Sequence, residues 1–598
     1  MVIHPPQHNT NAPEQSVEID SRSPPQASLS VYKSLSQDQD CMRLLQIHSA
    51  AKKDDPIACN LNEVTFGERP KFDALSYMWG SSQVERSITL NGVLVSIRQN
   101  LWDALYYLRE QAPGTSYWID AICINQKDIA ERNRQVRIMH HIYSGAQTVV
   151  VWLGKGYDTY DPTLPILQHL THNKPHGEGI QQERPTYQLS KDSAATEQQL
   201  AKDLYKDPYW SRVWIIQEIG HARRIKVCFG SVVAIDWNPF THFIGSHNVG
   251  SDGPLRLKHQ REDKHTGSTT LLQLLQAHKD AACQDRKDKV YGLVGLASDA
   301  RNFVIDYKRS VFEIWTDVMV FMNRQGLFAD KDIGFVGHLV KFLLMDTIDS
   351  PLEQIKRQYE PASGEDTIIT NIDHPKAFKL PAAMLGCVIH VGPHPHEIVG
   401  NLNTVDKWTE HVQANYKKDS KDAHRESDTI IRAMIDLDDV SLSKKCFDYR
   451  STIQWQAMGK SFENITHSGL DDWIETLQQE SNIQIDSDRP HTKCSLASHS
   501  RLFQMSYQSY AHRKLGLASS DIQVGDLVFW LRWPRRAVVV RVCGQRGRYC
   551  TLQVVGTAVV TDDLGESQLG CSQRKDWSDN LFKMDLYLDA GTIFILLA

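Results

Sequence analysis

The segment from Tyr117 to Gly154 constrains the fold of this 598-residue chain more than any other part of it. It reads YWIDAICINQKDIAERNRQVRIMHHIYSGAQTVVVWLG. Its first part, residues 117–124, is an apolar run that only Asp120 interrupts, and such a run is typical of a strand covered on both faces. Residues 148–153 are β-branched and aromatic, which predicts a second buried strand.

A helix is predicted between these two strands. Asp128 has the side chain of an N-cap residue and Glu131 stands three residues later, so the pair resembles a capping box. Apolar residues then recur at helical spacing on one face, and Gly145 ends the helix. The apolar face consists of Ile129, Val136, Met139, Ile142 and Tyr143. A strand, a helix and a strand with short links form a βαβ unit, which predicts a parallel sheet with a right-handed crossover.

The composition is that of an ordinary globular protein, with 41% apolar and 23% charged residues. The net charge of −6 creates no field that would attract nucleic acid or an anionic membrane, so we do not expect a nucleic-acid partner. The 11 cysteines are irregularly spaced, which favours a reducing compartment over a disulfide framework. No apolar run approaches the roughly 20 residues that span a bilayer, and no signal peptide is evident. We therefore expect a cytoplasmic protein without a membrane span.

The chain divides by composition and pattern into four expected regions. Residues 1–30 are polar and rich in Pro, Ser and Gln, and we expect a disordered tail there. Residues 40–300 are expected to form an α/β domain with an insertion at 155–206. A mixed helical region is expected at 301–500. Residues 501–598 contain β-branched and aromatic alternation broken by glycines, which predicts a small C-terminal β domain.

Further elements are predicted from local patterns. Asp207-Pro208 is typical of a helix start, with Asp as the cap and Pro at the first helical position. Asn91-Gly92 predicts a tight hairpin within residues 88–95. Residues 250–267 are expected to form a charged loop. Strands are also expected at 44–48, 57–61, 72–80 and 225–229, and helices at 101–109, 287–295 (packed on the sheet), 312–323, 338–346 and 430–435.

Four blocks of this sequence resemble the fungal heterokaryon incompatibility (HET) domain family. They are FDALSYMWG (72–80), the segment 117–154 quoted above, DPYWSRVWIIQEI (207–219) and DRKDKVYGLVGLASD (285–299). Weaker similarity extends into the C-terminal part, as in long HET proteins. The resemblance implies an effector or signalling domain of fungal non-self recognition and programmed cell death. It also implies protein partners or self-association in cell-death signalling.

The HET domain is in turn distantly similar to TIR domains, and the order of elements agrees with that similarity. Residues 72–80 correspond to the first TIR strand, 117–125 to the second, 148–154 to the third and 225–229 to the fourth. This resemblance implies an α/β fold with a TIR/flavodoxin-like parallel sheet flanked by helices in the N-terminal half. An α+β region with a small C-terminal β domain is expected to follow.

The segment SRVWIIQEI resembles the TIR helix that carries Ser, Trp and, four residues later, Glu. Here these are Ser211, Trp214 and Glu218, at i, i+3 and i+7 on one face of the predicted helix, with one extra residue between Ser and Trp. In NAD-cleaving TIR domains this Glu holds the nicotinamide-side ribose. The resemblance implies that Glu218 is catalytic, that Trp214 and Ser211 bind substrate, and that NAD is a substrate while no cofactor is needed. The alternative is a structural Glu218 paired with Arg212, Arg223 or a backbone amide.

Three residues of the first two predicted strands complete the candidate site. Ser76 and Trp79 follow the first strand, and Asp120 interrupts the second. We expect all three at the carboxyl edge of the sheet, where ligands bind in parallel α/β folds. Each also has a structural interpretation, because a Trp there is more often core and Asp120 could cap a loop or pair with Arg132 or Arg134.

One cluster has metal-ligating residue types but the wrong spacing. Cys387 and His390 precede His394 and His396, and the prolines between the histidines break any regular geometry. Structural zinc is usually held by two close pairs, and no second pair lies nearby. We therefore expect no metal site.

Two mechanisms remain open from the sequence. One is enzymatic, with TIR-like NAD cleavage through Glu218. The other is a non-enzymatic scaffold that self-associates and recruits cell-death machinery. A member of the family without activity is a third interpretation of the same residues.

Overall fold

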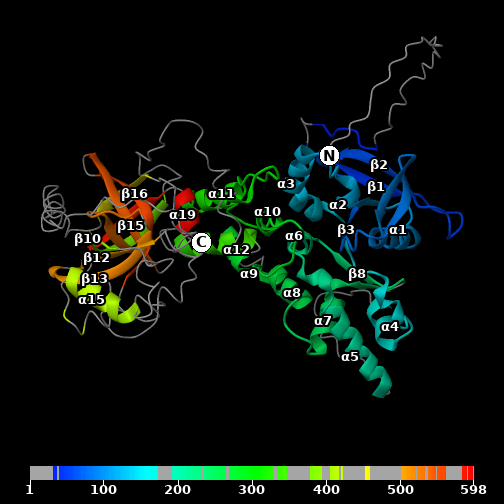
Figure 1. The fold of residues 1–598 in the computed structure, drawn as a ribbon. Coiled ribbons are helices and arrows are strands. Elements are labelled where there is room, and N and C mark those ends of the chain that lie inside the picture. The colour runs from blue at the N-terminus through cyan, green and yellow to red at the C-terminus, as the bar shows by residue number, and fades with distance from the viewer. Residues whose placement is uncertain are drawn as a thin grey trace, which may run out of the picture. The chain divides into compact units, whose positions relative to one another are not determined.

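The computed structural model of the chain divides into two compact units (Figure 1). The first unit comprises Met1–Arg132, Ala146–Lys174 and Lys226–Asp236, and the second Asn133–Gly145, Pro175–Ile225 and Trp237–Ala598. The residues that the structure describes are 31–36, 40–172, 191–231, 233–263, 269–326, 333–345, 378–392, 404–416, 419, 421, 452–457, 500–507, 509–519, 521–531, 536–546, 549–560, 582–588 and 590–596.

A sheet of nine strands forms the first unit, in the order β5-β4-β2-β1-β6-β3-β7-β8-β9. Several of its strands are labelled in Figure 1. The strands are β1 (Cys41–Ile47), β2 (Ala58–Thr65), β3 (Asp73–Tyr77), β4 (Glu85–Leu90), β5 (Val93–Arg98), β6 (Ser116–Trp118), β7 (Val149–Trp152), β8 (Ile225–Phe229) and β9 (Val233–Asp236).

Parallel pairing is concentrated around β3, which pairs in parallel with both β6 and β7. Numbered along the chain from β3 and without the β4–β5 hairpin, the strands β6-β3-β7-β8-β9 lie in the order 2-1-3-4-5. This is the strand order of flavodoxin-like sheets. The predicted α/β fold is therefore confirmed, although the sheet as a whole is mixed, because β1–β2, β1–β6, β4–β5 and β8–β9 are antiparallel.

The strand predicted over residues 117–124 is wrong beyond Trp118. The strand β6 ends there, and Asp120–Cys123 forms the short helix α2, whose residues Ile122 and Cys123 are buried. An apolar run of this length does not distinguish a buried strand from a buried helix, because both lack an exposed face. The Ile122 and Cys123 amides bond back to the Ile119 carbonyl, which closes the helical turn.

The helix α3 (Ile129–Gly145) begins and ends as predicted, but its capping box is wrong. Asp128 Oδ1 accepts hydrogen bonds from the amides of Ala130 (3.0 Å) and Glu131 (3.1 Å), so Asp128 is the N-cap. The Glu131 carboxylate instead pairs with the guanidinium of Arg43 at 2.5 and 2.9 Å. It also accepts from the Asn125 amide at 2.7 Å. Glu131 therefore binds Arg43, 88 positions earlier, instead of the Asp128 amide that a capping box would use.

The buried Arg43 joins three segments of the first unit. Besides Glu131, it donates to the Cys123 carbonyl at 3.1 Å and to the Lys33 carbonyl at 2.5 Å. Its guanidinium also lies 5.2 Å from the centre of the Tyr32 ring. Burial raises the pKa of Tyr32 to about 12, so its hydroxyl stays protonated and donates to the Ile122 carbonyl.

The hairpin β4–β5 and the helix α1 (Gln99–Gln111) form as predicted. Asn91 and Gly92 have φ values of 50° and 80°, as a type I′ turn requires at both central positions. Leu101, Leu105 and Leu108 of α1 are buried. The described residues of the insertion predicted at 155–206 include the helices α4 (Pro165–His172) and α5 (Lys191–Tyr205), and α4 contacts β9.

Helices dominate the N-terminal part of the second unit. The loop predicted at residues 250–267 is wrong, because Pro254–Asp263 forms the helix α8. The predicted helix at 287–295 is confirmed as α10 (Asp288–Val294), and within its unit it contacts α6, α9 and α12. The other helices are α6 (Trp214–His221), α7 (Trp237–Ser246), α9 (Leu271–Ala277), α11 (Val311–Arg324), α12 (Ile333–Leu344), α15 (Thr404–Tyr416) and α19 (Ala590–Leu596).

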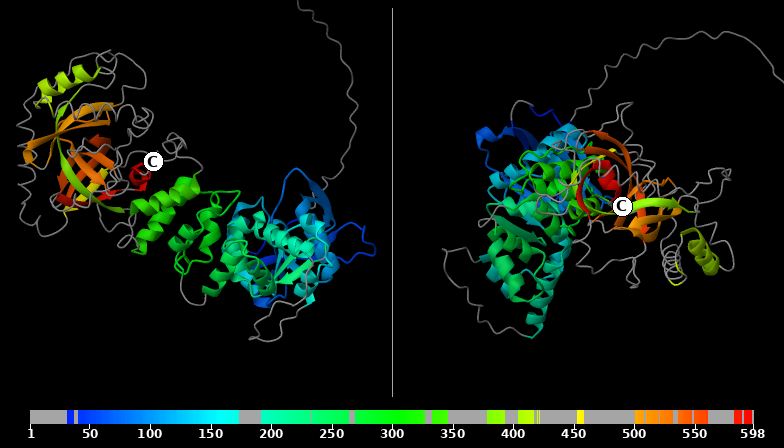
Figure 2. Two further views of the ribbon diagram at one scale, coloured as in Figure 1. Left: turned by 90° about the horizontal axis from the view of Figure 1, so that it is seen from below. Right: turned by 90° about the vertical axis from the view of Figure 1, so that its left-hand side faces the viewer.

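An antiparallel sheet of eight strands forms the C-terminal part of the second unit (Figure 2). The strand β10 (Phe378–Val391) pairs with β12, β14 and β17, so the sheet includes a strand from the region expected to be mixed helical. The remaining strands are β11 (Thr452–Ala457), β12 (Ser500–Tyr507), β13 (Ser509–Ser519), β14 (Leu527–Leu531), β15 (Arg536–Arg546), β16 (Tyr549–Val560) and β17 (Phe582–Leu588).

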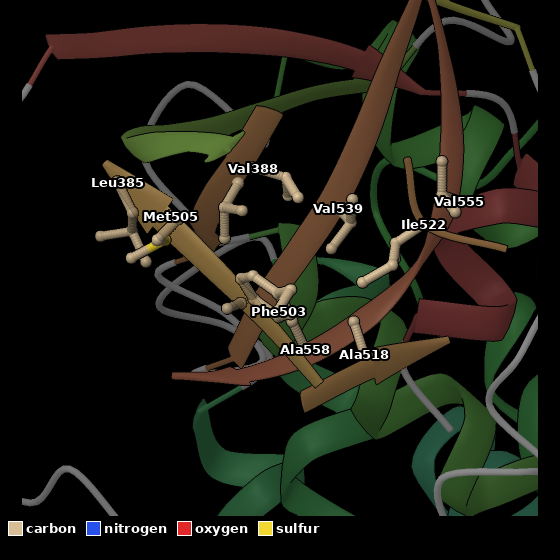
Figure 3. Packing of buried hydrophobic residues seen from close by; sticks show 11 residues of the cluster. Leu385, Val388, Phe503, Met505, Ala518, Ile522, Val539, Val555 and Ala558 are labelled. Atoms are coloured by element: carbon tan, nitrogen blue, oxygen red, sulfur yellow. The ribbon is translucent and has the colours of Figure 1, made fainter. Parts of the chain in front are cut away.

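The pairing of β14 with β10 closes a ring of six strands, β10-β12-β13-β16-β15-β14. Apolar side chains from this ring form one core cluster, and Figure 3 shows them between the strands that carry them. Val388 and Phe503 lie in it, as do Met505 and Val539. The buried Asp526 carboxylate, directly before β14, is paired with Arg541 of β15 at 2.8 Å.

Some predictions lie outside the described residues, namely the tail at 1–30, the helix at 430–435 and His394 with His396. Cys387 lies within β10, where its thiol is buried. Among the residues that the structure describes, no three His, Cys, Asp or Glu side chains are grouped so that they could hold a metal ion. None of the described helices has both the length and the apolar character that crossing a membrane requires.

Breaking the buried ion pair on one side is expected to destabilise the first unit. Either Arg43→Met or Glu131→Gln leaves the other charge or its hydrogen-bonding groups buried without their partner, at a cost of about 3–5 kcal/mol. The double variant Arg43→Met with Glu131→Leu is expected to recover much of this loss, because no buried charge remains. Chemical denaturation of the three variants measures the difference. Equal destabilisation by the single and double variants would contradict this account.

A second buried polar group, His278, follows α9. Its Nε2 lies 2.8 Å from the Gln260 side-chain amide on α8. Burial, with a smaller contribution from the nearby Arg256 charge, lowers the pKa of His278 to about 4. The folded chain therefore holds His278 neutral at pH values where an unfolded histidine binds a proton.

Stability is expected to decrease on acidification because of this histidine. The unfolded state has the higher pKa, 6.5 against about 4, so it binds more protons between these values and is favoured as the pH drops through that window. The difference of pKa corresponds to about 3 kcal/mol, fully lost near pH 4. His278→Gln is expected to remove this contribution. Unfolding free energies of parent and variant at pH 7 and pH 4.5 test it, and parallel losses in the two proteins would refute it.

Candidate functional site

Two of the predicted site residues meet in the first unit. Trp79 follows β3 and Asp120 follows β6, and the Trp79 indole Nε1 donates to Asp120 Oδ2 at 3.0 Å. These strands are parallel neighbours, so their carboxyl ends lie at one edge of the sheet, as expected. Asp120 Oδ1 accepts from the Ala121 amide at 2.7 Å, and both side chains remain half-buried. An aromatic face and a carboxylate therefore stand side by side at this edge.

Arg98, the last residue of β5, extends this pair. Its guanidinium lies over the Trp79 ring, 5.3 Å from the centroid, and donates to the Gly80 carbonyl at 2.9 Å. Gln126 donates from its side chain to the Asp120 carbonyl at 2.9 Å. Trp79 is thus held on one side by a cation and at its nitrogen by a carboxylate, which fixes the orientation of the indole ring.

Asn100 fastens the two loops that follow β3 and β7. Its side chain donates to the Met78 carbonyl at 2.6 Å and accepts from Trp152 Nε1 at 3.1 Å. Gly80 and Gly154 both have positive φ, and a Cβ on either would stand 3.3 Å from an Asn100 side-chain atom. The glycines that end FDALSYMWG and TVVVWLG therefore let both loops close on one asparagine.

The placement of Ser76 differs from expectation. Ser76 lies inside β3, opposite Val151 of β7, and its side chain is buried. The prediction that it follows the strand is wrong, because β3 runs to Tyr77. Ser76 belongs to the sheet interior, whereas Trp79 stands beyond the end of the strand.

The second unit carries the other three candidates, on the segment that follows Asp207. Asp207 accepts from the Tyr209 amide at 2.8 Å and caps a short 3-10 helix, Pro208–Ser211. The backbone then extends, with the Val213 amide bonded to the Ala282 carbonyl at 2.8 Å. The helix α6 begins only at Trp214.

The prediction of one helix carrying Ser211, Trp214 and Glu218 is therefore wrong for Ser211. The Ala282 amide bonds to the Ser211 carbonyl at 2.6 Å, so pairing with a distant segment takes the backbone groups that a continuous helix would use. Ser211 is exposed and its hydroxyl donates to the Pro208 carbonyl at 2.6 Å. Trp214 and Glu218 do share α6, four residues apart and hence on one face.

Glu218 is almost completely buried, with 3% of its surface exposed. Carboxylates are rarely buried to this degree without interacting groups, and Glu218 interacts with other groups of the chain. Its neighbour Gln217 is buried as well. With its amide nitrogen turned toward α10, Gln217 donates to the Gly292 carbonyl at 3.2 Å and accepts from the His140 amide at 3.0 Å.

The position of α6 is set by a close approach to α10 through glycines. A Cβ on Gly295 would stand 2.9 Å from the Gln217 side-chain amide, and one on Gly220 would stand 3.0 Å from Leu296. His221 lies with Nε2 3.2 Å from the Gly295 carbonyl. Gly295 in DKVYGLVG and Gly220 of α6 thus allow the helix that carries Glu218 to pack closely against α10 and the residues that follow it.

The sequence reasoning missed Arg98, Asn100 and Gln217. Positively charged residues beside tryptophan and an asparagine in the first turn of a helix give no local signal of their contacts. The glycines did give a local signal. Gly80, Gly154 and Gly295 end or interrupt motif blocks at positions where a side chain would be crowded.

Residues 72–218 of the chain match the family described as Heterokaryon incompatibility protein (HET). This match contains all six candidate residues and ends at Glu218. Over these residues the chain is similar to the heterokaryon incompatibility family.

Among curated proteins, the chain is 34% identical over 139 residues to Heterokaryon incompatibility protein 6, OR allele, of Neurospora crassa. The aligned part covers 21% of this chain and 20% of that relative, so the chain spans about a fifth of the length of the relative that it matches. No solved structure matches the chain.

Adding a methyl group at Gly295 is expected to disturb the seat of α6. Gly295 has helical backbone angles that alanine also adopts, so the cost comes from the collision with the confined Gln217 amide. We expect Gly295→Ala to cost about 1–3 kcal/mol of unfolding free energy. Gly292→Ala is the matched control, because its Cβ meets only ordinary contacts at 3.4 Å or more. Denaturant titration measures the unfolding free energy of both variants. An equal loss in the two would contradict the close approach of α6 to α10 at Gly295.

Proposed function

We propose that this protein is an effector of fungal heterokaryon incompatibility that acts in non-self recognition and regulated cell death. The HET match and the similarity to an incompatibility protein of Neurospora crassa support this role. We further propose that it acts as an NAD glycohydrolase, with Glu218 as the catalytic residue. The flavodoxin-like strand order around β3 supports the relation to TIR domains from which this mechanism is inferred.

The observation that carries the proposal is the buried Glu218 on a rigidly seated helix. Backbone pairing with Ala282 fixes the start of α6, and the glycine contacts with α10 hold the rest of it. Trp214, four residues earlier, stands on the same face and remains half-buried. A carboxylate four residues from an aromatic side chain, on a helix held by backbone and side-chain contacts, suits a site that must place charge accurately.

The chemistry needs only one carboxylate. Nicotinamide leaves C1′ of the ribose as a neutral molecule, because the electron pair of the C1′–N bond neutralises the pyridinium nitrogen. Positive charge then develops on the ribose, and the Glu218 carboxylate would stabilise it. Water adds to C1′ and releases one proton, which gives ADP-ribose. No acid is required for the leaving group, in contrast to ordinary glycoside hydrolysis.

Trp79 and Asp120 are proposed to bind substrate, as the resemblance to TIR domains implies. The Trp79 face suits stacking with a planar ring, and the Asp120 carboxylate, which accepts from the Trp79 indole, is the type of group that binds a ribose hydroxyl. Ser211 and Ser76 have weaker support, because Ser211 lies outside α6 and Ser76 is buried within β3.

Glu218→Gln is expected to reduce NAD cleavage by about a hundred-fold or more, because the charge that stabilises the transition state is lost. The assay measures nicotinamide release by the full chain, dilute and after clustering through an antibody against a terminal tag. Thermal unfolding of the variant reports whether the fold is retained.

Glu197→Gln is the matched control for this variant. Glu197 is also a buried glutamate of the second unit, 5% exposed on α5, and no catalytic role is proposed for it. We expect it to cleave NAD as the parent does. If Glu218→Gln keeps full activity, the catalytic assignment is wrong. If the parent cleaves no NAD even when clustered, the enzymatic proposal itself is wrong.

The second candidate function is a non-enzymatic scaffold that self-associates and recruits cell-death machinery. One observation favours it, namely the strand β5 at the edge of the nine-strand sheet, whose apolar Leu94 is exposed. In that case killing would persist in Glu218→Gln and depend on assembly alone.

A further inference from the structure

The strand β5 (Val93–Arg98) lies at one end of the nine-strand sheet and, among the described residues, pairs only with β4. Its pairing is regular, and residues 93–97 contain neither a charge nor a proline. Natural sheets usually protect an edge with charges, prolines or bulges. Leu94 is 73% exposed, the largest exposure among the described large apolar side chains that stand at the surface. This edge is therefore built to pair rather than to repel.

The turn geometry shows which backbone groups face the open side. In a type I′ hairpin the residues next to the turn, Leu90 and Val93, form a hydrogen-bonded pair, and the pattern then alternates. The Gln99 amide bonds to the Val84 carbonyl at 3.0 Å, which fits this alternation. It follows that Leu94, Ser96 and Arg98 direct their backbone groups away from β4. The Arg98 carbonyl begins α1, so its amide is the outward group at that end.

We propose that β5 pairs in an antiparallel manner with β5 of a second copy of this chain, about a twofold axis at Ser96. Ser96 then stands opposite Ser96 of the other copy and exchanges two hydrogen bonds with it. The Arg98 amide of each copy donates to the Leu94 carbonyl of the other. The result is a continuous sheet through two first units.

A second copy fits this edge because the edge is complementary to itself. Antiparallel pairing about a twofold axis uses the same patch on both partners. The side chains of Leu94 and Arg98 leave the same face of β5, so the axis places each Leu94 over the aliphatic stem of the partner's Arg98. The opposite edge is less suited, because β9 has four residues and contacts α4.

The pairing would act on the candidate site through Arg98. This side chain already stacks over Trp79, which donates to Asp120. Covering Arg98 with an apolar side chain removes it from water and strengthens its contact with the indole ring. The inference deepens the proposed self-association and rests on it for its biological use, whereas the pairing itself rests on the geometry of the edge.

The first test is sedimentation of the full chain over a concentration series. The parent is expected to form dimers, and Leu94→Lys is expected to weaken dimerisation about ten-fold or more, because it places like charges opposite Arg98 of the partner. Val304→Lys is the matched control, since Val304 is 52% exposed and belongs to the second unit. A parent that stays monomeric throughout, or a Leu94→Lys variant that dimerises like the parent, overturns the proposal.

The second test fixes the register and does not depend on the lysine variant. Opposed residues of a hydrogen-bonded antiparallel pair have Cα atoms about 5.5 Å apart, within the range of a disulfide. Ser96→Cys is expected to give a covalent dimer under mild oxidation. Ser87→Cys on β4 is the control, because the two copies of this residue would be roughly 14 Å apart. Cross-linking of both variants alike, or of neither, overturns the register.

These outcomes are separate from the outcome for NAD cleavage. Loss of dimers in Leu94→Lys with unchanged nicotinamide release confirms the edge and shows that the enzyme needs no assembly. A dimeric parent without any NAD cleavage leaves the edge intact and removes only the enzymatic proposal.

Discussion

The ion pair between Arg43 and Glu131 is the constraint on which the first unit depends. Two opposite charges are buried together, and burying either one alone costs several kcal/mol. The Arg43 guanidinium donates to the Cys123 carbonyl at the end of α2 and to the Lys33 carbonyl near the N-terminus. The Glu131 carboxylate accepts a hydrogen bond from the Asn125 amide, which precedes α3. The segment between β6 and α3 is therefore held at both of its ends, and Asp120 stands at its beginning. The ion pair thus helps to position Asp120 without taking part in any chemistry.

The motif residues act mainly by allowing backbones to come close. Gly80 and Gly154 permit two loops to close on Asn100, and Gly295 permits α6 to seat on α10. Such contacts leave no room for a side chain, which explains why glycine stands at these positions. Glu218 is one of several ionisable residues of these blocks that are buried, together with Glu131, Asp288 and Lys289.

Local patterns predicted the elements whose determinants are local. The Asn91-Gly92 hairpin, the Asp128 cap and the Gly145 end of α3 depend on residues a few positions apart, and all three are confirmed. The predictions failed where a distant partner decides the structure. Glu131 left its capping box for Arg43, and Ser211 left the predicted helix because its carbonyl pairs with Ala282. The sequence predicted that Trp79 and Asp120 lie at the same edge of the sheet. It did not predict their hydrogen bond, because the spacing of residues does not determine side-chain geometry.

Glu218 and the edge strand β5 differ in their surroundings, because Glu218 is buried on α6 whereas β5, among the described strands, has one unpaired side. Glu218 lies on a helix whose start is paired with Ala282 and whose later turns lie close to Gly295 and Leu296. Arg98 lies in a different setting, because it ends the open edge strand and stacks on Trp79. Pairing at the edge would cover Arg98 and so change the environment of Trp79, on which it stacks, and of Asp120, to which Trp79 donates.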